Sequence, residues 1–220
     1  MHAARLNRRR ALCCVAAGAA VALAAPALAS SRRALARMTD GPFYPPRSWR
    51  ERWPDWDADL TRVQQAGGGR VAQGEHLGLE GRVIDVNERM IDGATIEIWQ
   101  CDAVGHYRHP STEPATERVD EAFQGFGATR SEAQGQYRFR TIKPVPYPGR
   151  TPHIHVKLRH ASFGEITSQL FVADDPGNAR DFLWRALPAG DRPALEMRLH
   201  NAATDTGLRW LVRHDLVVPA

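Results

Sequence analysis

The chain has 220 residues, of which 43% are hydrophobic and 25% charged, with 29 Lys and Arg against 25 Asp and Glu. These proportions indicate a soluble globular protein of one domain, or at most two small ones. The three cysteines exclude a fully paired disulfide framework. The formal charge of +4 favours an anionic partner, such as nucleic acid or a membrane, only if the basic residues gather on the folded surface.

The first 29 residues predict an export signal. They contain four arginines and no acidic residue, then an apolar run over 11–25, and then the small residues Ala27-Leu28-Ala29. This order is typical of a cleaved signal peptide, and the apolar run is short for a membrane span. Because Asn7-Arg8-Arg9-Arg10 resembles the start of a twin-arginine signal, we expect export to the periplasm by that route.

Cleavage of this signal changes the charge of the chain. It removes four basic and no acidic residues, so 25 basic and 25 acidic residues remain and the formal charge falls to zero. Cys13 and Cys14 leave with the signal, and Cys101 stays as a single thiol. We therefore expect no nucleic-acid partner and, after cleavage, no membrane contact.

The mature chain divides by composition into an arm and a core domain. Residues 30–75 are rich in Pro and Trp, contain the run Gly67-Gly68-Gly69, and predict an irregular arm with one short helix around Leu60. Apolar residues alternate from residue 76 onward, which predicts a β-domain over 76–220. The predicted strands cover residues 77–83, 94–98, 137–142, 153–158, 166–172 and 208–217.

Only one segment of the core domain has a helical pattern. Residues 178–187 place Phe182, Leu183, Ala186 and Leu187 on one face of a predicted helix. Many short strands with one short helix are typical of an all-β fold, and we expect a β-sandwich of mostly antiparallel strands.

The most informative stretch is Pro152-His153-Ile154-His155-Val156. In a strand, His153 and His155 point to the same face with Cα atoms roughly 6.5 to 7 Å apart, while Ile154 and Val156 enter the core. Two imidazoles in this arrangement can reach one metal ion, although the same pattern also occurs on ordinary surface strands.

Two tyrosines lie where no hydrophobic pattern requires an aromatic side chain. Tyr107 follows the predicted strand that ends near Gln100, and Tyr147 lies in a loop rich in Pro and Gly just before His153. Phenolate oxygens are hard, anionic donors, and their combination with two imidazoles suits ferric iron better than zinc or copper(I). A zinc or copper site that uses His153 and His155 with other donors remains an alternative.

At this point the sequence resembles a known family. The motifs that carry the resemblance are Gly41-Pro42-Phe43-Tyr44-Pro45-Pro46, Leu79-Glu80-Gly81-Arg82-Val83, Ile96-Glu97-Ile98-Trp99-Gln100, Gly135-Gln136-Tyr137-Arg138-Phe139 and Thr167-Ser168-Gln169-Leu170-Phe171. Together with the Tyr and His positions they are similar to the intradiol ring-cleavage dioxygenases, the nonheme ferric family that includes protocatechuate 3,4-dioxygenase and catechol 1,2-dioxygenase.

The resemblance implies a metal site and a reaction. It implies that one Fe³⁺ per chain is held by Tyr107, Tyr147, His153 and His155. It also implies that the enzyme uses O2 to cleave a catechol-type ring between its two hydroxyls, which gives a cis,cis-muconate-type diacid. Tyr147 corresponds to the axial ligand that leaves when substrate binds and so counts as catalytic.

Three further residues receive roles. Arg150 matches a family arginine that lies against the bound substrate, and Gln169 matches a polar residue beside the iron. Tyr44 lies in the Pro-rich arm, which could cover the cleft, and we expect it to contact substrate. A homo-oligomer is compatible with the family.

The sequence departs from the family in one loop and leaves one other class of protein open. Only five residues separate Tyr147 from His153, where well-known members have a longer segment with a Trp, so we expect a more open pocket. Gly105-His106-Tyr107 and Gly135-Gln136-Tyr137 also fit the Gly-x-Tyr strands of prealbumin-like modules. The alternative is therefore an exported β-sandwich binding module without catalytic activity.

Overall fold

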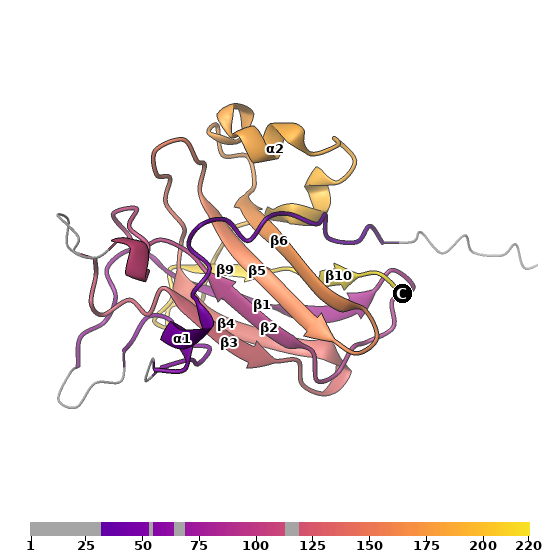
Figure 1. The fold of residues 1–220 in the computed structure, drawn as a ribbon, viewed down its shortest axis with the longest axis horizontal. Helices are drawn as coiled ribbons and strands as arrows, with labels where there is room; N and C mark the ends of the chain where they lie inside the picture. The colour runs from indigo at the N-terminus through magenta and orange to yellow at the C-terminus, as the bar shows by residue number, and fades with distance from the viewer. Residues whose placement is uncertain (1–31, 53–54, 64–68, 113–118) are drawn as a thin grey trace, which may run out of the picture. The chain divides into compact units, whose positions relative to one another are not determined.

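The computed structural model of the protein describes residues 32–52, 55–63, 69–112 and 119–220 (Figure 1). The predicted export signal lies outside the described residues, as do Gly67 and Gly68 of the arm. In the described ranges, no helix has both the length and the apolar character that are needed to cross a membrane.

Strands dominate the part of the chain that the structure describes, and the two α-helices are short. The strands are β1 (His76–Asp85), β2 (Thr95–Trp99), β3 (Phe126–Arg130), β4 (Gln136–Ile142), β5 (His153–His160), β6 (Gly164–Val172), β7 (Glu196–Met197), β8 (His200–Asn201), β9 (Trp210–Arg213) and β10 (Leu216–Val218). The helices are α1 (Arg47–Arg50) and α2 (Phe182–Ala186), with 3-10 turns at Pro110–Thr112, Ala133–Gly135, Asn178–Arg180 and Arg192–Leu195.

The described strands form two sheets of five strands each. In the first, β4 runs antiparallel to β1, while β9 and β10 run parallel to successive halves of β1, and β8 lies beyond β9. In the second, the order is β3-β2-β5-β6-β7, and β5 is antiparallel to both of its neighbours (Figure 1). The predicted all-β sandwich of mostly antiparallel strands is confirmed.

The second sheet has one apolar face and one polar face, because side chains alternate along a strand. Its apolar face belongs to the hydrophobic core and includes Ile96, Ile98, Ile154, Val156 and Leu158. Each such side chain contributes about 1.5 to 3 kcal/mol when it leaves water, so the core fixes which way the strand faces. The opposite face of β5 therefore presents the histidines.

The helix predicted over 178–187 is interrupted. The structure has a 3-10 turn at Asn178–Arg180 and then α2, separated by Asp181 in an extended conformation with φ −70° and ψ 126°. The Asp181 carboxylate accepts hydrogen bonds from the backbone N–H groups of Leu183 and Trp184, at 2.9 and 3.0 Å. A residue that caps a helix start cannot lie inside a helix, so the apolar pattern overestimated its length.

The arm also differs from expectation. The helix predicted around Leu60 does not form, because Leu60 donates and accepts backbone hydrogen bonds with Arg140 and Gln124 instead. The α-helix of the described arm is α1, a single turn after Pro46. Tertiary hydrogen bonds to the sandwich therefore replace the local bonds that a helix would need.

The strand predicted over 208–217 is divided into β9 and β10, which pair with different halves of β1. Between them the His214 carbonyl oxygen passes over Gly81, where a Cβ atom added to Gly81 would lie only 2.0 Å from it. The Tyr137 hydroxyl donates a 2.6 Å hydrogen bond to the same carbonyl. The missing side chain at Gly81 therefore lets the chain cross β1.

We expect Gly81→Ala to destabilise the fold by about 3 kcal/mol or more, because the new methyl group meets backbone rather than a flexible side chain. Urea unfolding measures this change. Arg82→Ala is the matched control at the next, exposed position, with an expected change within about 0.5 kcal/mol. Equal urea midpoints for Gly81→Ala and the wild type would contradict the claim that the chain can cross β1 only where position 81 has no side chain.

Candidate metal centre

Strand β5 places His153 and His155 side by side on the outer face of the second sheet. Both are buried, each with 2% of its surface exposed. His155 lies opposite Trp99 of β2 and opposite Gln169 of β6. The Trp99 and His155 rings stack, with centroids 4.7 Å apart and planes 13° from parallel. Strand β2 therefore holds the His155 ring in place through the contact of Trp99 with one face of that ring.

The four predicted donor side chains lie together. The Nε2 atoms of His153 and His155 are 3.3 Å apart, and the Tyr107 hydroxyl oxygen lies 3.4 Å from His153 Nε2. The Tyr147 ring centroid is 5.6 Å from those of both Tyr107 and His153. Two loops and one strand thus bring two phenols and two imidazoles to one point.

The tautomer of His153 follows from its neighbours. Its Nδ1 lies 2.7 Å from the backbone carbonyl oxygen of Thr151, which only accepts hydrogen bonds, so Nδ1 carries the proton and Nε2 presents a lone pair. Burial, with Arg150 adding to it, lowers the pKa of His153 to about 4. Burial and the neighbouring His153 lower the pKa of His155 well below its usual value. Both imidazoles are therefore neutral at pH 7, as metal ligands must be.

The two phenols differ in their surroundings. Tyr107 is 4% exposed and stacks on Phe43 of the arm, with centroids 4.4 Å apart and planes 16° from parallel. Burial raises the pKa of Tyr107 well above 10, and the nearby Tyr147 raises it further. Burial also raises the pKa of Tyr147, but Arg150 opposes this effect. The two phenols therefore differ in their burial and in the guanidinium that stands beside Tyr147.

This donor set fits a hard, highly charged metal ion. Two imidazole nitrogens and two phenol oxygens converge, and a bound cation favours the phenolate form of each tyrosine. Among the described residues, no group of three or more His, Cys, Asp and Glu side chains lies close enough to hold a metal ion. A zinc or copper site at His153 and His155 would therefore have no third His, Cys, Asp or Glu ligand among the described residues.

Arg150 connects three parts of the site. Its guanidinium donates to Asp181 at 2.8 Å and to Gln169 Oε1 at 2.6 Å, and it lies 3.5 Å from the Tyr147 hydroxyl. Burial alone would raise the pKa of Asp181, but hydrogen bonds from Trp184 N and from Arg150 lower it below its usual value. A charged pair therefore fixes the guanidinium beside Tyr147.

Gln169 has a second polar atom that the described residues do not use. Its Oε1 is taken by Arg150, while its Nε2 is buried and has no hydrogen-bond partner. An unpaired buried amide group costs about 1 to 3 kcal/mol, which is commonly recovered when a ligand supplies the acceptor.

A cavity of about 530 Å³ opens beside this site, between the loop that carries Tyr147 and Arg150 and the segment before α2. Pro146, Pro152 and Arg180 also line it. The volume suits a small aromatic ligand. Tyr147 is half-buried and lines this cavity, and the more open pocket expected from the short loop stays a prediction.

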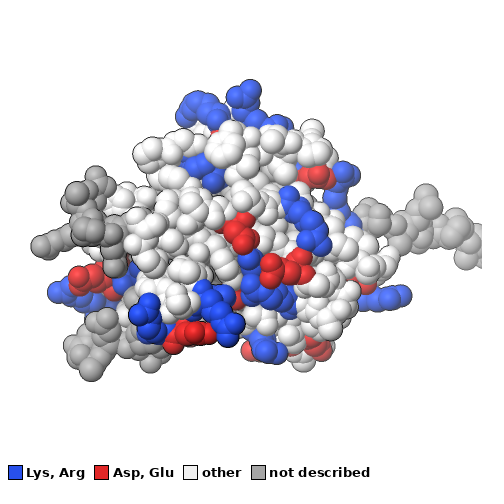
Figure 2. Space-filling model, in the orientation of Figure 1, with Lys and Arg blue, Asp and Glu red and all other residues white. Residues whose placement is uncertain are grey.

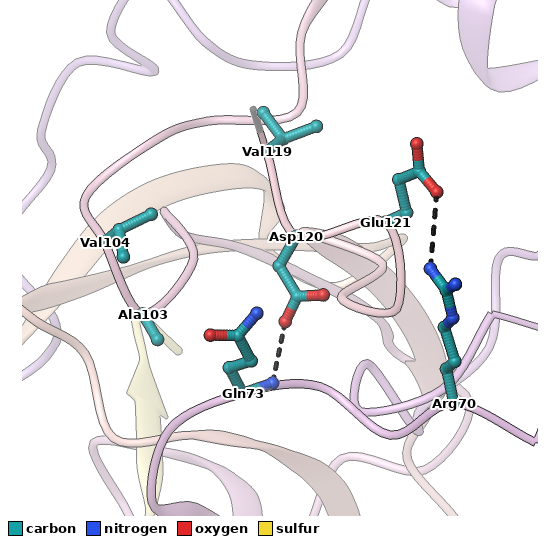
Figure 3. A pocket seen from close by; sticks show the side chains of 7 residues that line it. All are labelled: Arg70, Gln73, Ala103, Val104, Val119, Asp120 and Glu121. Atoms are coloured by element: carbon teal, nitrogen blue, oxygen red, sulfur yellow. Dashed lines mark hydrogen bonds and ion pairs between the residues drawn. The ribbon is translucent and has the colours of Figure 1, made fainter. Parts of the chain in front are cut away.

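A second hollow of about 320 Å³ contains none of these donors (Figure 3). Its polar groups pair with one another: Asp120 accepts a 2.7 Å hydrogen bond from Gln73 N, and Arg70 lies 3.8 Å from Glu121. This hollow is therefore not a candidate for the same chemistry.

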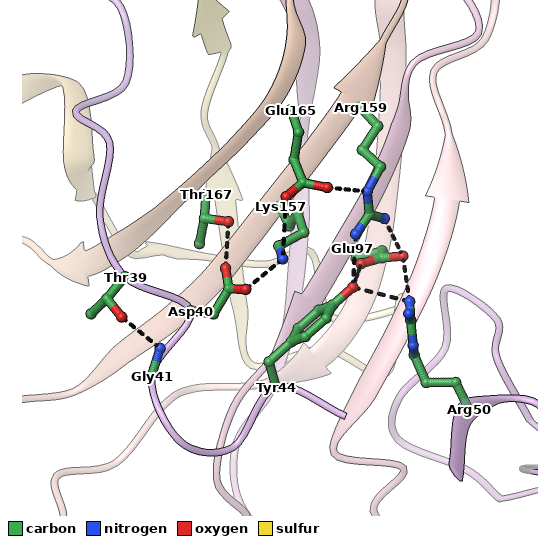
Figure 4. Close-up of polar contacts among 10 residues, drawn as sticks. All are labelled: Thr39, Asp40, Gly41, Tyr44, Arg50, Glu97, Lys157, Arg159, Glu165 and Thr167. Carbon is green, nitrogen blue, oxygen red and sulfur yellow. Dashed lines mark hydrogen bonds and ion pairs between the residues drawn. The ribbon is translucent and has the colours of Figure 1, made fainter. Parts of the chain in front are cut away.

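The ring of Trp99 lies between Tyr44 and the donor His155. The Tyr44 hydroxyl donates to Glu97 at 2.6 Å and accepts from Arg159 at 2.9 Å (Figure 4). The Tyr44 ring packs edge-on against Trp99, with centroids 4.9 Å apart. Substrate contact by Tyr44 stays a prediction.

Sequence reasoning missed several residues that shape the site. They are Asp181, which holds Arg150, Trp99, which stacks on His155, and Phe182, which is 62% exposed with Arg150 5.5 Å from its ring centroid. The first two depend on pairings between distant segments, for which a single sequence offers no local signal. The helical pattern assigned Phe182 to the apolar face of the predicted helix, whereas the structure leaves it exposed beside Arg150.

The charge of the visible surface is mixed. Figure 2 shows Lys and Arg interspersed with Asp and Glu on this face, without a large area of one sign. Bulk electrostatics therefore give an acidic ligand no special preference for this face, and Arg150 and Arg180 are the local cations of the cavity.

Comparison with known proteins finds a family model and similar dioxygenases. The Dioxygenase_C family model, described as a dioxygenase, matches residues 40–217. The protocatechuate 3,4-dioxygenase beta chain of Burkholderia cepacia is 32% identical over 170 residues, which is 74% of this chain and 71% of the relative. Hydroxyquinol 1,2-dioxygenase of Corynebacterium glutamicum is 31% identical over 123 residues, 48% of this chain, and the match spans only 38% of that relative.

Solved structures share the fold. The dioxygenase domain of a carbohydrate-binding fusion protein from Streptomyces sp. SirexAA-E matches with a TM-score of 0.60 at 24% identity, over 86% of this chain and 99% of that one. An intradiol ring-cleavage dioxygenase from Tetranychus urticae matches with a TM-score of 0.64 at 18% identity, over 86% and 95%. Since the family match covers most of the sandwich and the part of the arm next to it, the chain belongs to the intradiol ring-cleavage dioxygenase family.

Proposed function

We propose that the protein is a nonheme ferric intradiol dioxygenase that opens a catechol-type ring between its two hydroxyls with O2 and releases a cis,cis-muconate-type diacid. The observation that carries the proposal is the convergence of two phenols and two neutral imidazoles next to a cavity that Arg150 lines. Tyr107, Tyr147, His153 and His155 would hold one Fe³⁺ ion. When bound, the ion would supply the Lewis acidity that activates an aromatic diol toward O2.

The surroundings of the two phenols support different roles. Tyr107 is buried and covered by Phe43, which suits a ligand that stays in place. Tyr147 is partly exposed, lies on the cavity and has Arg150 beside its hydroxyl. As a phenolate, Tyr147 would accept one of the two hydroxyl protons of an incoming diol at its Oη atom and would so act as the base for that hydroxyl.

Arg150 and Gln169 would act on the substrate side. The Arg150 guanidinium is held by Asp181 and Gln169, so its charge is preorganised where the ring oxygens gain negative charge. The unpaired Gln169 Nε2 would donate a hydrogen bond to an oxygen of a ligand bound at the donor side chains. Fixed donors of this kind need no rearrangement during reaction.

The binding-module alternative is not favoured, because the similar proteins are named as dioxygenases and the donor atoms converge. The names of the relatives refer to protocatechuate and to hydroxyquinol as their substrates. For this chain the proposal is limited to the shared chemistry, an aromatic ring with two adjacent hydroxyls.

The colour of the purified protein tests the proposal. We expect about one iron per chain and a red-brown protein, because charge transfer from tyrosinate to Fe³⁺ absorbs visible light. Addition of catechol should shift this band under anaerobic conditions, and O2 should then yield the ultraviolet absorbance of the ring-opened diacid. A colourless protein with stoichiometric iron, or a protein that retains zinc, would contradict the assignment.

A further inference from the structure

A short part of the arm, residues 40–44, lies against the donor rings; we call it the covering segment. Gly41 has φ +72°, and a Cβ atom added to it would lie 3.4 Å from His155 Cε1. Phe43 stacks on the Tyr107 ring at 4.4 Å. The covering segment therefore stacks on one phenol of the site and passes close to one of its imidazoles, with no room to spare for a side chain at Gly41.

Charged side chains of the sheet hold the covering segment at both of its ends (Figure 4). At one end, Asp40 accepts from Lys157 Nζ at 2.7 Å and from the Thr167 hydroxyl at 2.6 Å. At the other end, the Tyr44 hydroxyl donates to Glu97 at 2.6 Å. Gly41 and Phe43 lie between these two attachments.

The attachments continue the same sheet face that carries the histidines. Glu97 lies two residues before Trp99 on β2, and Lys157 lies two residues after His155 on β5, so these side chains share one face. Lys157 and Glu97 also stand opposite each other in the register. The cross-strand pair Trp99 and His155 therefore contains a donor ring, and the next pair on the same face, Glu97 and Lys157, holds the arm.

The buried charges define where the arm sits. The Lys157 side chain is 4% exposed and the Glu97 side chain 5% exposed. Charges at this depth need partners in good geometry, since an unpaired one costs several kcal/mol. Asp40 and, at 3.6 Å, Glu165 supply carboxylates to Lys157, and Arg159, Arg50 and Tyr44 surround Glu97.

A second line of contact runs through aromatic rings. The Tyr44 ring packs edge-on against Trp99 at 4.9 Å, and Trp99 stacks on His155 at 4.7 Å. Lys157 Nζ lies 3.8 Å from the Tyr44 ring centroid, which adds a cation–π contact to the Tyr44 ring. A shift of Tyr44 would therefore reach His155 through one intervening ring.

We propose that Asp40 and Tyr44 are positioning residues of the metal centre: bound to Lys157 and Glu97, they fix the covering segment, which in turn fixes the His155 and Tyr107 rings. This inference rests on the proposed iron site. Residues behind metal ligands typically change metal affinity about 10- to 100-fold when they are replaced, because they set the orientation of the ligand.

The test measures iron rather than turnover. Asp40→Asn removes the charge, and Tyr44→Phe removes only the hydroxyl and keeps the ring. For each purified, iron-loaded variant we expect loss of iron to excess EDTA about 10-fold faster than in the wild type, and a shifted charge-transfer band. Arg32→Gln is the matched control: it breaks an ion pair of the arm with Glu88 and Asp215 and leaves the covering segment intact.

The outcomes separate this inference from the proposed function. A wild-type protein without iron or colour would remove the basis of both. Wild-type iron and colour, with variants that release iron at the wild-type rate and keep the band unchanged, would overturn only the positioning role. A higher KM for catechol in Tyr44→Phe, with an unchanged rate of iron release, would also overturn only the positioning role, because the hydroxyl would then act by contacting substrate. Circular dichroism confirms that each variant is folded, and a band shift in folded protein excludes a purely structural effect.

Discussion

Replacing His155 with Ala is expected to abolish iron binding at stoichiometric concentrations and, with it, ring cleavage. The imidazole is buried, neutral at pH 7 and stacked on Trp99, so it can bind a metal ion without first losing the proton of an imidazolium. Loss of a residue behind a ligand costs about 10- to 100-fold in affinity, and loss of the ligand itself should exceed that range. Metal analysis and the visible spectrum measure the change.

The control for this variant uses the same strand and residue type. His160 lies at the end of β5, where its Nδ1 is within 2.8 Å of the Ser162 hydroxyl, far along the strand from the donors. His160→Ala should keep wild-type iron content and colour. Full iron content in His155→Ala would contradict the ligand assignment.

Tyr107→Phe is a sharper version of the same test, because it removes one oxygen and keeps the ring that stacks on Phe43. The fold should tolerate this change, since burial already disfavours the charged phenol in the absence of metal. We expect weakened iron binding and loss of most visible absorbance. Retention of the full band would leave Tyr147 as the only tyrosinate ligand.

The parts of the site that the sequence predicted depend on local rules. Strand alternation alone sends His153 and His155 to one face and Ile154 to the other, and the core burial of Ile154 agrees with it. The positions of Tyr107 and Tyr147 came from the family resemblance. Loop residues have no periodic signal, so their convergence could not be derived from composition or spacing.

The parts that could not be predicted depend on pairing between distant segments. The register that sets Trp99 opposite His155 is fixed by the packing of β2 on β5 and not by either strand alone. Asp181 interrupts a segment with a helical pattern because its carboxylate accepts from the N-terminus of α2, from the Thr151 N–H and from Arg150. Gly81 permits the crossing between β9 and β10 through a contact that only the folded chain makes.

Arg150 is the residue whose replacement should separate stability from chemistry. In Arg150→Leu the Asp181 carboxylate, whose side chain is 0% exposed, loses its cation, and one broken partner of a buried pair costs about 3 to 5 kcal/mol. The same variant removes the charge beside Tyr147, and loss of a preorganised donor lowers kcat about 10²- to 10³-fold. Urea unfolding and steady-state kinetics at matched iron content measure the two effects.

A second substitution tells these effects apart. Asp181→Asn removes the buried negative charge and keeps one oxygen for the backbone N–H groups at the start of α2, while its new Nδ2 faces the Thr151 N–H that donates to Oδ2 at 3.0 Å. The double variant Arg150→Leu with Asp181→Asn should therefore recover part of the stability, while kcat stays low because the guanidinium is still missing. Recovery of kcat together with stability would show that Arg150 acts only through the fold.

Arg150→Lys separates the effect of charge from that of geometry, because it keeps the positive charge and loses the planar set of guanidinium donors. A guanidinium can donate to Asp181 and Gln169 at once and still lie beside the Tyr147 hydroxyl. An ammonium is a single compact donor on a flexible stem. We expect Arg150→Lys to retain more stability than Arg150→Leu and to recover only part of kcat. Wild-type kcat in the lysine variant would mean that positive charge alone is sufficient and that the hydrogen bonds to Asp181 and Gln169 serve stability.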